Sequence, residues 1–476
     1  MLKATMPDAL PLTIAEAAAA LRAKRVSSLE LTRELLARAH ATQDTVAAFE
    51  TFTEDSAIKA AQKADAERAS GEVRGPLHGI PLAIKDILAT HDAPTTASSR
   101  VLDRSWGQRQ DATTVKKLRE AGAVLLGKLV LHEFAIGSPD PQTGMRFAMN
   151  PWDMTRLPGG SSSGTGAAVA AGLILGGLGT DTGGSIRGPA SYCGITGLKP
   201  TFGRVSKEGC VPLSYSLDHI GPMARTARDC ALLLQAIAGF DPLDPSTVRR
   251  EVPDYQGALN GSVAGLRIGI PREYFFDSPE LDTEVRDAVL KAIDQLTDAG
   301  ATVKDVVLPH AAVARVAQRV IMLGEAYAYH QANLAQQPMN YGKWTRRQLI
   351  QGAIYSAGDY VQAQRMRSIV KTEVAEKMVD LDVLVTPTSV SPASIFEGYD
   401  PESTRRSPSF MAIWNLTGQP AASVCCGFTN AGLPIGLQII GKPFDDATVL
   451  RVGDAYQQLT NWHTRTPAVS RQVLPA

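Results

Sequence analysis

Two serines and one lysine stand out as residues that could transfer an acyl group without a histidine. Ser161 lies in the segment P-G-G-S-S-S-G-T-G, and Ser185 lies in G-T-D-T-G-G-S-I-R-G-P, with a long apolar run between them. Lys85 ends the short apolar segment I-P-L-A-I. A serine hydroxyl becomes a good nucleophile when a neighbouring base accepts its proton. The three residues together therefore indicate acyl transfer through a serine ester.

The residues just before Ser185 favour a tight turn. Gly183 and Gly184 allow a sharp bend in which successive backbone N–H groups point the same way. Amides beside a nucleophile stabilise the oxyanion of a tetrahedral intermediate by about 3 kcal/mol for each donor. The structural alternative is a turn in which Ser185 caps the following helix. The serine- and glycine-rich surroundings favour the catalytic interpretation.

Ser161 is the second hydroxyl, and we interpret it as a relay that passes the proton of Ser185 to Lys85. To accept that proton the lysine must be neutral, and burial can lower the pKa of a lysine by several units. The apolar residues before Lys85 predict such burial. Asp86, the next residue, could instead hold Lys85 in an ordinary ion pair. The residues alone leave both alternatives open.

Other motifs compete for the chemistry. Ser162 is the central serine of a G-x-S-x-G pattern, but R-L-P-G-G precedes it where an α/β-hydrolase needs an apolar strand. Ser56 begins an S-x-x-K pattern on a charged helix, without the companion motifs of penicillin-binding enzymes. The glycine-rich segment lacks the nucleotide-binding patterns, and the histidines lack metal-ligand spacing, so we expect no metal. The histidines available for a hydrolase triad are His219, His310, His330 and His463.

Composition narrows the class of protein. The 476 residues exceed one ordinary core, yet no linker divides them, so we expect one domain over residues 1–476. A formal net charge of zero argues against nucleic acid and anionic membranes as partners. Five scattered cysteines without C-x-x-C fit a reducing compartment, and we expect a cytoplasmic protein. The longest apolar stretch, Gly166 to Gly179, is too short to span a bilayer and predicts a buried helix and turn.

The pattern of elements predicts an α/β fold. Residues 1–70 look helical, with capping boxes at Thr13–Glu16 and Ser27–Glu30. From Gly79 onward, short apolar segments alternate with amphipathic helices, which predicts a central mixed β-sheet covered by helices on both faces. Residues 311–378 form a long helical stretch that we interpret as an insertion over the sheet. The oligomeric state stays open, a homodimer included.

The stretch G-G-S-S-S-G-T-G-A-A-V-A-A-G-L-I-L-G-G-L-G-T-D-T-G-G-S-I-R-G-P-A resembles the signature of the amidase signature family. The segments G-I-P-L-A-I-K-D-I, H-E-F-A-I-G, N-P-W-D and C-G-I-T-G-L-K-P-T-F-G-R-V-S resemble family segments as well. The resemblance implies the amidase signature fold, with a catalytic core at 79–229, the signature at 158–189 and a substrate-side cap at 311–378. It also implies amide hydrolysis, with esters and carbamates as related substrates, and no cofactor.

Position by position, the resemblance implies a role for each signature residue. Ser185 would be the acyl-forming nucleophile, Lys85 the general base and acid, and Ser161 the bridging serine, which follows a cis peptide bond in this family. The remaining assignments form three groups: an oxyanion hole of Thr182, Gly183, Gly184 and the Ser185 amide, bracing by Asp181 and Arg187, and support of the hydroxyl network by Ser162.

The substrate is harder to predict. One branch of the family, which supplies the glutaminase component of glutamine-dependent aminoacyl-tRNA amidotransferases, resembles this chain in R-R-Q-L-I-Q-G-A-I-Y-S-A-G, where Arg346 or Arg347 would match an arginine that grips the glutamine carboxylate. That branch also has an aspartate for the α-amine, but residues 407–415 contain no acid. We therefore expect a free-standing hydrolase of a less polar small amide or carbamate, and the alternative is the glutaminase component. Candidate pocket residues, which could equally be core, are Phe410, Met411 and Trp414.

Overall fold

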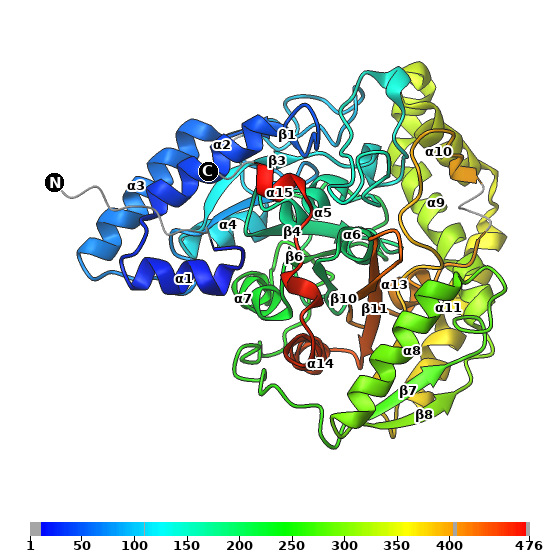
Figure 1. The fold of residues 1–476 in the computed structure, drawn as a ribbon. Coiled ribbons are helices and arrows are strands. Elements are labelled where there is room, and N and C mark those ends of the chain that lie inside the picture. Colours follow the sequence, from blue (N-terminus) through cyan, green and yellow to red (C-terminus); the bar gives the residue numbers. More distant parts are fainter. Residues whose placement is uncertain (1–10, 109, 403–406, 473–476) are drawn as a thin grey trace.

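An eleven-stranded sheet runs through the computed structural model, which describes residues 11–108, 110–402 and 407–472 (Figure 1). In spatial order the strands are β1 (Phe49–Phe52), β3 (Val124–Leu129), β2 (Pro81–Lys85), β4 (Gly176–Asp181), β6 (His219–Ala224), β5 (Thr196–Lys199), β10 (Ala421–Phe428), β11 (Pro434–Gly441), β9 (Val383–Pro387), β7 (Arg267–Pro271) and β8 (Thr302–Val306). Strand β2 pairs in parallel with β3 and with β4, and β7 pairs in parallel with β8 and with β9. The other neighbouring pairs are antiparallel, so the sheet is mixed, as predicted.

Helices cover both faces of this sheet. Ser423 and Val424 are neighbours on β10, so their side chains point to opposite faces. A side chain on Gly436 of β11 would meet both Ser423 and Ser191 of α6 (Arg187–Cys193). A side chain on Gly453 of α14 (Asp446–Leu459) would meet Val424 instead. Hence α6 and α14 lie on opposite faces, α5 (Ser163–Ala170) packs beside α6, and α7 (Ala227–Ile237) packs beside α14.

The N-terminal helices begin where the sequence predicts. Thr13 and Glu16 form a capping box at the start of α1 (Ile14–Arg22), and Ser27 and Glu30 form another at α2 (Ser28–Ala41). Both predictions are confirmed, because each cap side chain and each glutamate satisfies a backbone N–H that has no partner in the first turn. Further helices are α3 (Glu54–Ala69), α4 (Thr113–Glu120), α8 (Thr283–Asp298), α13 (Ala412–Thr417) and α15 (Val469–Gln472), with 3₁₀ turns at Glu133–Ala135, Pro141–Thr143, Pro338–Asn340 and Trp462–Thr464.

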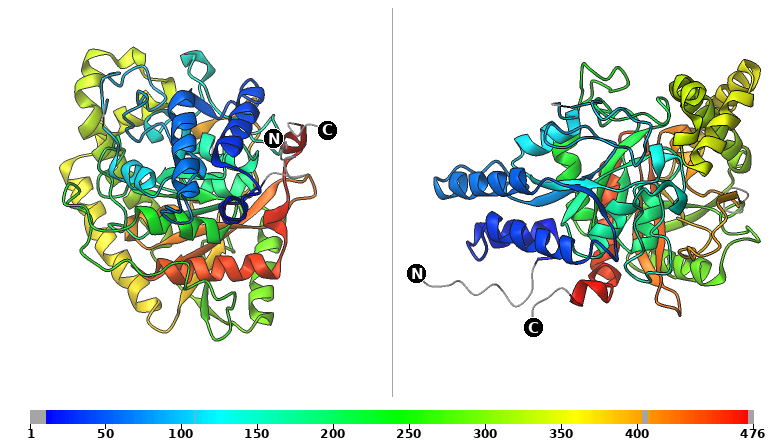
Figure 2. Two further views of the ribbon diagram at one scale, coloured as in Figure 1. Left: turned by 90° about the vertical axis from the view of Figure 1, so that its left-hand side faces the viewer. Right: turned by 90° about the horizontal axis from the view of Figure 1, so that it is seen from above.

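The predicted insertion forms three helices, α9 (Ala311–Gln336), α10 (Lys343–Ile354) and α11 (Ala357–Lys377). Both α10 and α11 pack against α9, and α9 also packs against α13. Figures 1 and 2 show this group, in yellow and yellow-green, at the end of the molecule opposite α1 to α3. The insertion therefore forms a separate helical layer at the end of the molecule away from the N-terminal helices.

The apolar stretch from Gly166 to Gly179 differs in part from its prediction as a helix and turn. Its first residues complete α5, but from Gly176 the chain forms β4, a strand inside the sheet between β2 and β6. A Cβ on Gly177 would lie 2.4 Å from the carbonyl oxygen of Ala83, so the close strand approach needs glycine there. The small residues that suggested a turn thus serve a crowded strand. In the described residues, no helix has the length and hydropathy to cross a bilayer.

Candidate active site

Lys85 reaches two hydroxyl groups at the centre of the candidate active site. It is the last residue of β2, and its side chain is fully buried. The Nζ atom donates to Oγ of Ser161 at 2.7 Å and to Oγ1 of Thr180, on the neighbouring strand β4, at 2.7 Å. Parallel pairing of β2 with β4 places these groups side by side. Thr180 was not identified from the sequence, because a lone threonine in a strand carries no signal.

Burial lowers the pKa of the Lys85 amine to about 7, although nearby acidic groups oppose the shift. Asp86, which could have held this lysine in an ion pair, points elsewhere. Its Oδ1 atom lies 2.8 Å from Nζ of Lys128, and its Oδ2 accepts a hydrogen bond from the Thr96 amide at 3.0 Å. The Asp86 carboxylate therefore forms no ion pair with Lys85. Because the pKa of Lys85 is about 7, a large fraction of its amine is neutral near pH 7.

Ser161 and Ser162 are adjacent in the signature segment but have different contacts. The peptide bond between Gly160 and Ser161 is cis, as the family resemblance implies. A Cβ on Gly160 would lie 2.0 Å from Cε1 of His132, so a residue without a side chain is needed there. Oγ of Ser162 donates to the Thr180 carbonyl and accepts from the Thr180 amide, each at 3.2 Å. Ser162 is thus bound to β4 rather than presented to a substrate.

Ser185 lies in the turn between β4 and α6, and its side chain is half-buried. The Ser162 amide donates to the Ser185 carbonyl at 3.2 Å, which holds the two signature segments together. Ser161 and Ser185 both line one cavity of about 340 Å³. The structure therefore presents both of these hydroxyls to the same small space.

The turn before Ser185 uses its amides in two ways. Gly184 has φ of +129°, a conformation that side chains rarely allow, and its N–H donates to Oδ1 of Asp181 at 2.7 Å. This amide braces the turn, which corrects the expectation that it faces an oxyanion. Gly183 and Ser185 line the cavity, as does Thr182. The amides of Thr182, Gly183 and Ser185 consequently stay candidates for oxyanion donors.

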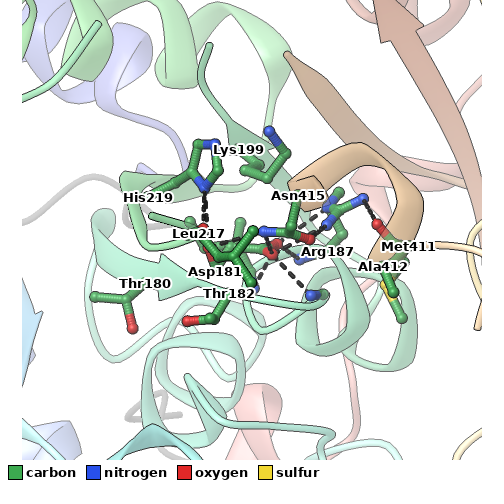
Figure 3. A network of polar contacts seen from close by, with 12 residues as sticks. Thr180, Asp181, Thr182, Arg187, Lys199, Leu217, His219, Met411, Ala412 and Asn415 are labelled. Carbon is green, nitrogen blue, oxygen red and sulfur yellow. Dashed lines mark hydrogen bonds and ion pairs between the residues drawn. The ribbon is translucent and has the colours of Figure 1, made fainter. Parts of the chain in front are cut away.

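Asp181 and Arg187 form a buried ion pair beneath the turn (Figure 3). The guanidinium contacts the carboxylate at 3.0 Å through Nε and again through Nη2. Oδ1 of Asp181 also accepts from the side chain of Asn415 at 2.8 Å, and Nη1 of Arg187 donates to Gln438 at 2.7 Å. Burial raises the pKa of the Asp181 carboxyl, but Arg187, together with Lys199 and Asn415, lowers it by more, and the net shift of the pKa is downward. The pair fixes the position of the turn that carries Ser185.

Two other buried basic groups lie near this pair (Figure 3). Burial, with the charge of Arg187, lowers the pKa of Lys199 well below its ordinary value, and Nζ of Lys199 donates to the carbonyls of Pro200 and Gln419. Burial and the nearby Lys199 likewise lower the pKa of His219. His219 therefore stays uncharged near neutral pH, and its Nδ1 lies 2.6 Å from the Leu217 carbonyl rather than against a serine.

Replacing Arg187 with methionine is expected to lower the free energy of unfolding by about 3–5 kcal/mol, because Asp181 would keep a buried charge without its partner. Denaturant unfolding measures the change. The matched control is Arg272→Met, which breaks an ion pair with Asp305 in which the two side chains are 46% and 62% exposed, and it should cost no more than about 1 kcal/mol. Equal losses in the two variants would contradict the structural role assigned to Arg187.

The candidate pocket residues separate into two groups. Phe410 and Met411 line the cavity, whereas Trp414 does not. The Trp414 side chain is completely buried and stacks on Phe275 with ring centroids 6.0 Å apart, so it belongs to the core. Phe410 and Met411 precede α13 (Ala412–Thr417), whereas Trp414 lies within that helix and packs on the core, and the sequence does not indicate which way each side chain points. The pocket prediction for Trp414 is corrected accordingly.

Neither arginine of the R-R-Q-L segment lines the cavity. Nη1 of Arg346 donates to the Pro338 carbonyl at 3.2 Å, and Arg347 is 54% exposed with its Nε 3.7 Å from Glu402. The cavity takes its arginines from α9 instead, together with other residues that the sequence did not single out. These lining residues are His132, Arg315, Gln318, Arg319, Met322 and Gln348.

The competing motifs do not gather around the cavity. Ser56 donates to Oδ2 of Asp92 at 2.6 Å on the N-terminal side of the molecule. Of the histidines considered for a hydrolase triad, His330 lies 2.9 Å from the Tyr341 hydroxyl, and His310 contacts Glu373 on α11. Since Ser162 is also engaged with β4, the geometry does not support a serine–histidine triad at that residue.

Known proteins resemble this chain over nearly its full length. The family model for amidases matches residues 30–450. The chain is 45% identical to the A subunit of glutamyl-tRNA(Gln) amidotransferase from Chloroflexus aurantiacus, over 96% of this chain and 98% of that protein. A second comparison is with a chain from the solved structure of a vestigial complex that is described as revealing the evolutionary origins of an s-triazine catabolic enzyme. That chain is 34% identical to this one and has a TM-score of 0.88, and the match covers 94% of this chain and 98% of that chain. The native peptide amidase from Stenotrophomonas maltophilia is 32% identical with a TM-score of 0.83, covering 95% and 98%.

Proposed function

Because the chain belongs to the amidase family, we propose that it cleaves a carboxamide C–N bond through an acyl-enzyme on Ser185. The observation that carries this proposal is the 2.7 Å contact between a buried Lys85 amine of lowered pKa and the Ser161 hydroxyl. A neutral amine in that position is a base, and the second serine extends its reach toward the cavity.

The proposed reaction begins when Oγ of Ser185 attacks the amide carbon. Its proton passes to Ser161, whose own proton passes to Nζ of Lys85. The carbonyl oxygen becomes an oxyanion, which the amides of Gly183 and Ser185 stabilise. The intermediate collapses as the C–N bond breaks, and Lys85 returns the proton through Ser161 to the leaving nitrogen. Water then attacks the Ser185 ester by the same route and releases the acid.

We propose that the helical insertion is the substrate-side cap. Arg315 and Gln318 of α9 and Gln348 of α10 line the same cavity as the signature serines. Nε2 of Gln318 donates to the Thr182 carbonyl at 2.9 Å and so ties α9 to the catalytic turn. This placement supports a role for the insertion in choosing the substrate.

The relatives support one physiological role better than the other. Full-length similarity to A subunits of glutamyl-tRNA(Gln) amidotransferases favours the role of a glutaminase component over the free-standing hydrolase expected from the sequence. A specific observation keeps the second role in view: among the described residues that line the cavity, none is an aspartate or glutamate that could pair with the ammonium of glutamine. A free-standing enzyme would act on a carboxamide, carbamate or ester without that ammonium.

Turnover of glutamine and of glutaric acid monoamide, which differ only in the ammonium group, separates the two roles. A glutaminase component should prefer glutamine and gain activity when copurified partner proteins are added. A free-standing hydrolase should prefer the monoamide and need no partner. Release of ammonia measures both reactions.

A fluorophosphonate probe tests the proposed nucleophile. We expect the purified protein to form one adduct on Ser185, which peptide mass mapping locates. The adduct should disappear in Ser185→Ala and form more slowly in Lys85→Ala, because the base that activates the hydroxyl is missing. An adduct on Ser162 in the unmodified protein would contradict the mechanism.

A further inference from the structure

Asp218 is a buried carboxylate in contact with the turn that carries Ser185. It lies just before β6 and is 8% exposed. Oδ1 of Asp218 accepts a hydrogen bond from Oγ1 of Thr182 at 2.6 Å. Oδ2 accepts from the amides of Leu213 and Ser214, each at 2.9 Å. Hydrogen bonds to a charged acceptor are strong, so Asp218 joins the first residue of the turn firmly to the loop before β6.

Thr182 is held through both its side chain and its backbone. It follows β4 directly and lines the cavity, and antiparallel pairing of β4 with β6 brings it close to Asp218. The Thr182 carbonyl accepts from Nε2 of Gln318 at 2.9 Å. That carbonyl belongs to the same peptide group as the N–H of Gly183, a candidate oxyanion donor. The two bonds of Thr182 therefore fix the start of the turn and the direction of its amides.

The helical insertion also binds the loop before β6. Oε1 of Glu325, on α9, accepts from the Ser216 hydroxyl at 2.7 Å, and Oε2 accepts from the Ser216 amide at 3.0 Å. The Tyr360 hydroxyl, on α11, donates to Oε1 of the same carboxylate at 2.8 Å. Nη2 of Arg367, also on α11, donates to the Ser216 carbonyl at 2.9 Å. The loop that leads to Asp218 is thus fixed by two helices of the insertion.

We propose that Asp218 is a positioning residue for the proposed hydrolysis, which fixes the oxyanion turn through the Thr182 hydroxyl and places a negative charge near the base. The inference rests on the proposed reaction at Ser185. Donors stabilise an oxyanion best when they are already aimed at the place where its charge develops. Without the bond from Thr182, the turn would have to order its amides during the reaction, which raises the barrier. Asp218 is not among the described residues that line the cavity, so it acts through its neighbours.

Thr182→Val removes the hydroxyl and keeps the size of the side chain. We expect kcat to fall about 10- to 100-fold, the range for a hydrogen bond to a charged group, with little change in KM. Thr182→Ser, which keeps the hydroxyl, should retain most of the activity. Hydrolysis of glutamine or of glutaric acid monoamide, whichever reacts faster, measures kcat and KM. An unchanged kcat in Thr182→Val, or an equal fall in both variants, would overturn the inference.

Thr113→Val is the matched control, because Thr113 binds another buried aspartate away from the cavity. Its Oγ1 atom donates to Oδ2 of Asp241 at 2.6 Å, and Asp241 is 6% exposed. Neither residue lines the cavity. Both valine variants leave a buried carboxylate with one donor fewer, so both should lose stability, whereas kcat should fall only in Thr182→Val. An equal fall of kcat in the two variants would show a loss of stability alone and overturn the assignment.

The charge of Asp218 favours the protonated form of Lys85. The titratable groups that interact with the Lys85 amine are Cys210, Asp181, Asp218 and His132. Burial raises the pKa of the Cys210 thiol to about 12 and lowers that of His132 to about 4, so both are uncharged near pH 7. Asp181 is paired with Arg187, whereas Asp218 is in none of the ion pairs between described residues. Burial raises the pKa of Asp218, and the Thr182 hydroxyl, two backbone amides and the charge of Lys207 oppose that shift.

Asp218→Asn removes this charge while keeping the size of the side chain. The loss of a nearby negative charge disfavours the ammonium form, so the pKa of Lys85 should fall. The acid limb of kcat/KM should therefore move to lower pH, and it should stay in place in Asp241→Asn. A limb that stays in place or moves to higher pH in Asp218→Asn would contradict the proposed action of Asp218 on the base.

Hydrogen exchange keeps this inference separate from the proposed reaction. Exchange at the amides of residues 183–187 should become about tenfold faster or more in Thr182→Val, because the turn loses a bond to a charged group. Thr113→Val should leave that exchange unchanged. Faster exchange only in Thr182→Val supports the inference even if a fluorophosphonate does not label Ser185. If exchange in the turn is the same in both variants, the inference is wrong whatever the reaction proves to be.

Discussion

Ser185→Ala is expected to lower kcat by about 10⁴-fold or more, on the scale seen when a serine enzyme loses its nucleophile. The variant should fold normally, because the Ser185 side chain is half-buried and the turn is held by its backbone and by Asp181. Substrate should still bind, so KM or an inhibition constant should change little. Steady-state hydrolysis of glutamine or of glutaric acid monoamide, whichever reacts faster, measures the effect, with thermal unfolding as a check of the fold.

Ser163→Ala is the matched control for this result. Ser163 belongs to the same signature segment, and its buried Oγ has no hydrogen-bond partner among the described residues. Removing that hydroxyl should leave kcat almost unchanged. If Ser185→Ala kept more than about one tenth of the activity, a second nucleophile or a non-covalent route would have to replace the proposed acyl-enzyme.

The second large effect concerns pH. Since Lys85 must be neutral in the free enzyme and its pKa lies at about 7, kcat/KM should fall tenfold for each pH unit below that value and level off above it. A protonated Lys85 cannot accept the proton that Ser161 passes on, so acid removes the base rather than the substrate. A profile that stays flat well below the pKa of Lys85 would contradict its role as the base.

Lys85→Met separates this catalytic effect from stability. The variant should lose activity about as strongly as Ser185→Ala, because the two residues act in one unit. The folded protein holds Lys85 at a pKa below its ordinary value of 10.5, so the unfolded chain binds more protons between about pH 7 and pH 10. The wild type therefore gains stability from this group as pH rises through that range, and Lys85→Met should lack the gain. Unfolding in denaturant at about pH 6 and about pH 9 measures the difference.

The three residues to which we assign the reaction were singled out from the sequence because they lie in dense local motifs. Ser161, Ser185 and Lys85 each follow a pattern of glycine or apolar residues that fixes the backbone around them, and the structure brings their segments together. The two capping boxes were equally clear, because a capping box involves residues only three positions apart. Patterns within short segments therefore predicted both the first two helices and the central residues of the candidate site.

The residues that the sequence missed depend on contacts between distant segments. Gln318 meets Thr182 across 136 positions, and Arg319 reaches the cavity only because α9 packs over the signature turn. Helical spacing indicates that these residues share a face, but not what the face meets. Trp414 shows the opposite error: an aromatic residue next to two lining residues turned out to pack against Phe275. The family resemblance also implies a role for Arg346 or Arg347, which the fold places outside the cavity.

The hydrogen bond from Gln318 to Thr182 has a consequence for protein engineering. One way to change the substrate specificity would be to replace helices α9 to α11 with the corresponding helices of another amidase. Such a graft would also replace a contact of the turn that carries Ser185, the proposed nucleophile, so a change of substrate could not be separated from a change in turnover. Chimeras that keep a glutamine at the position of Gln318 should therefore retain more activity than those that do not.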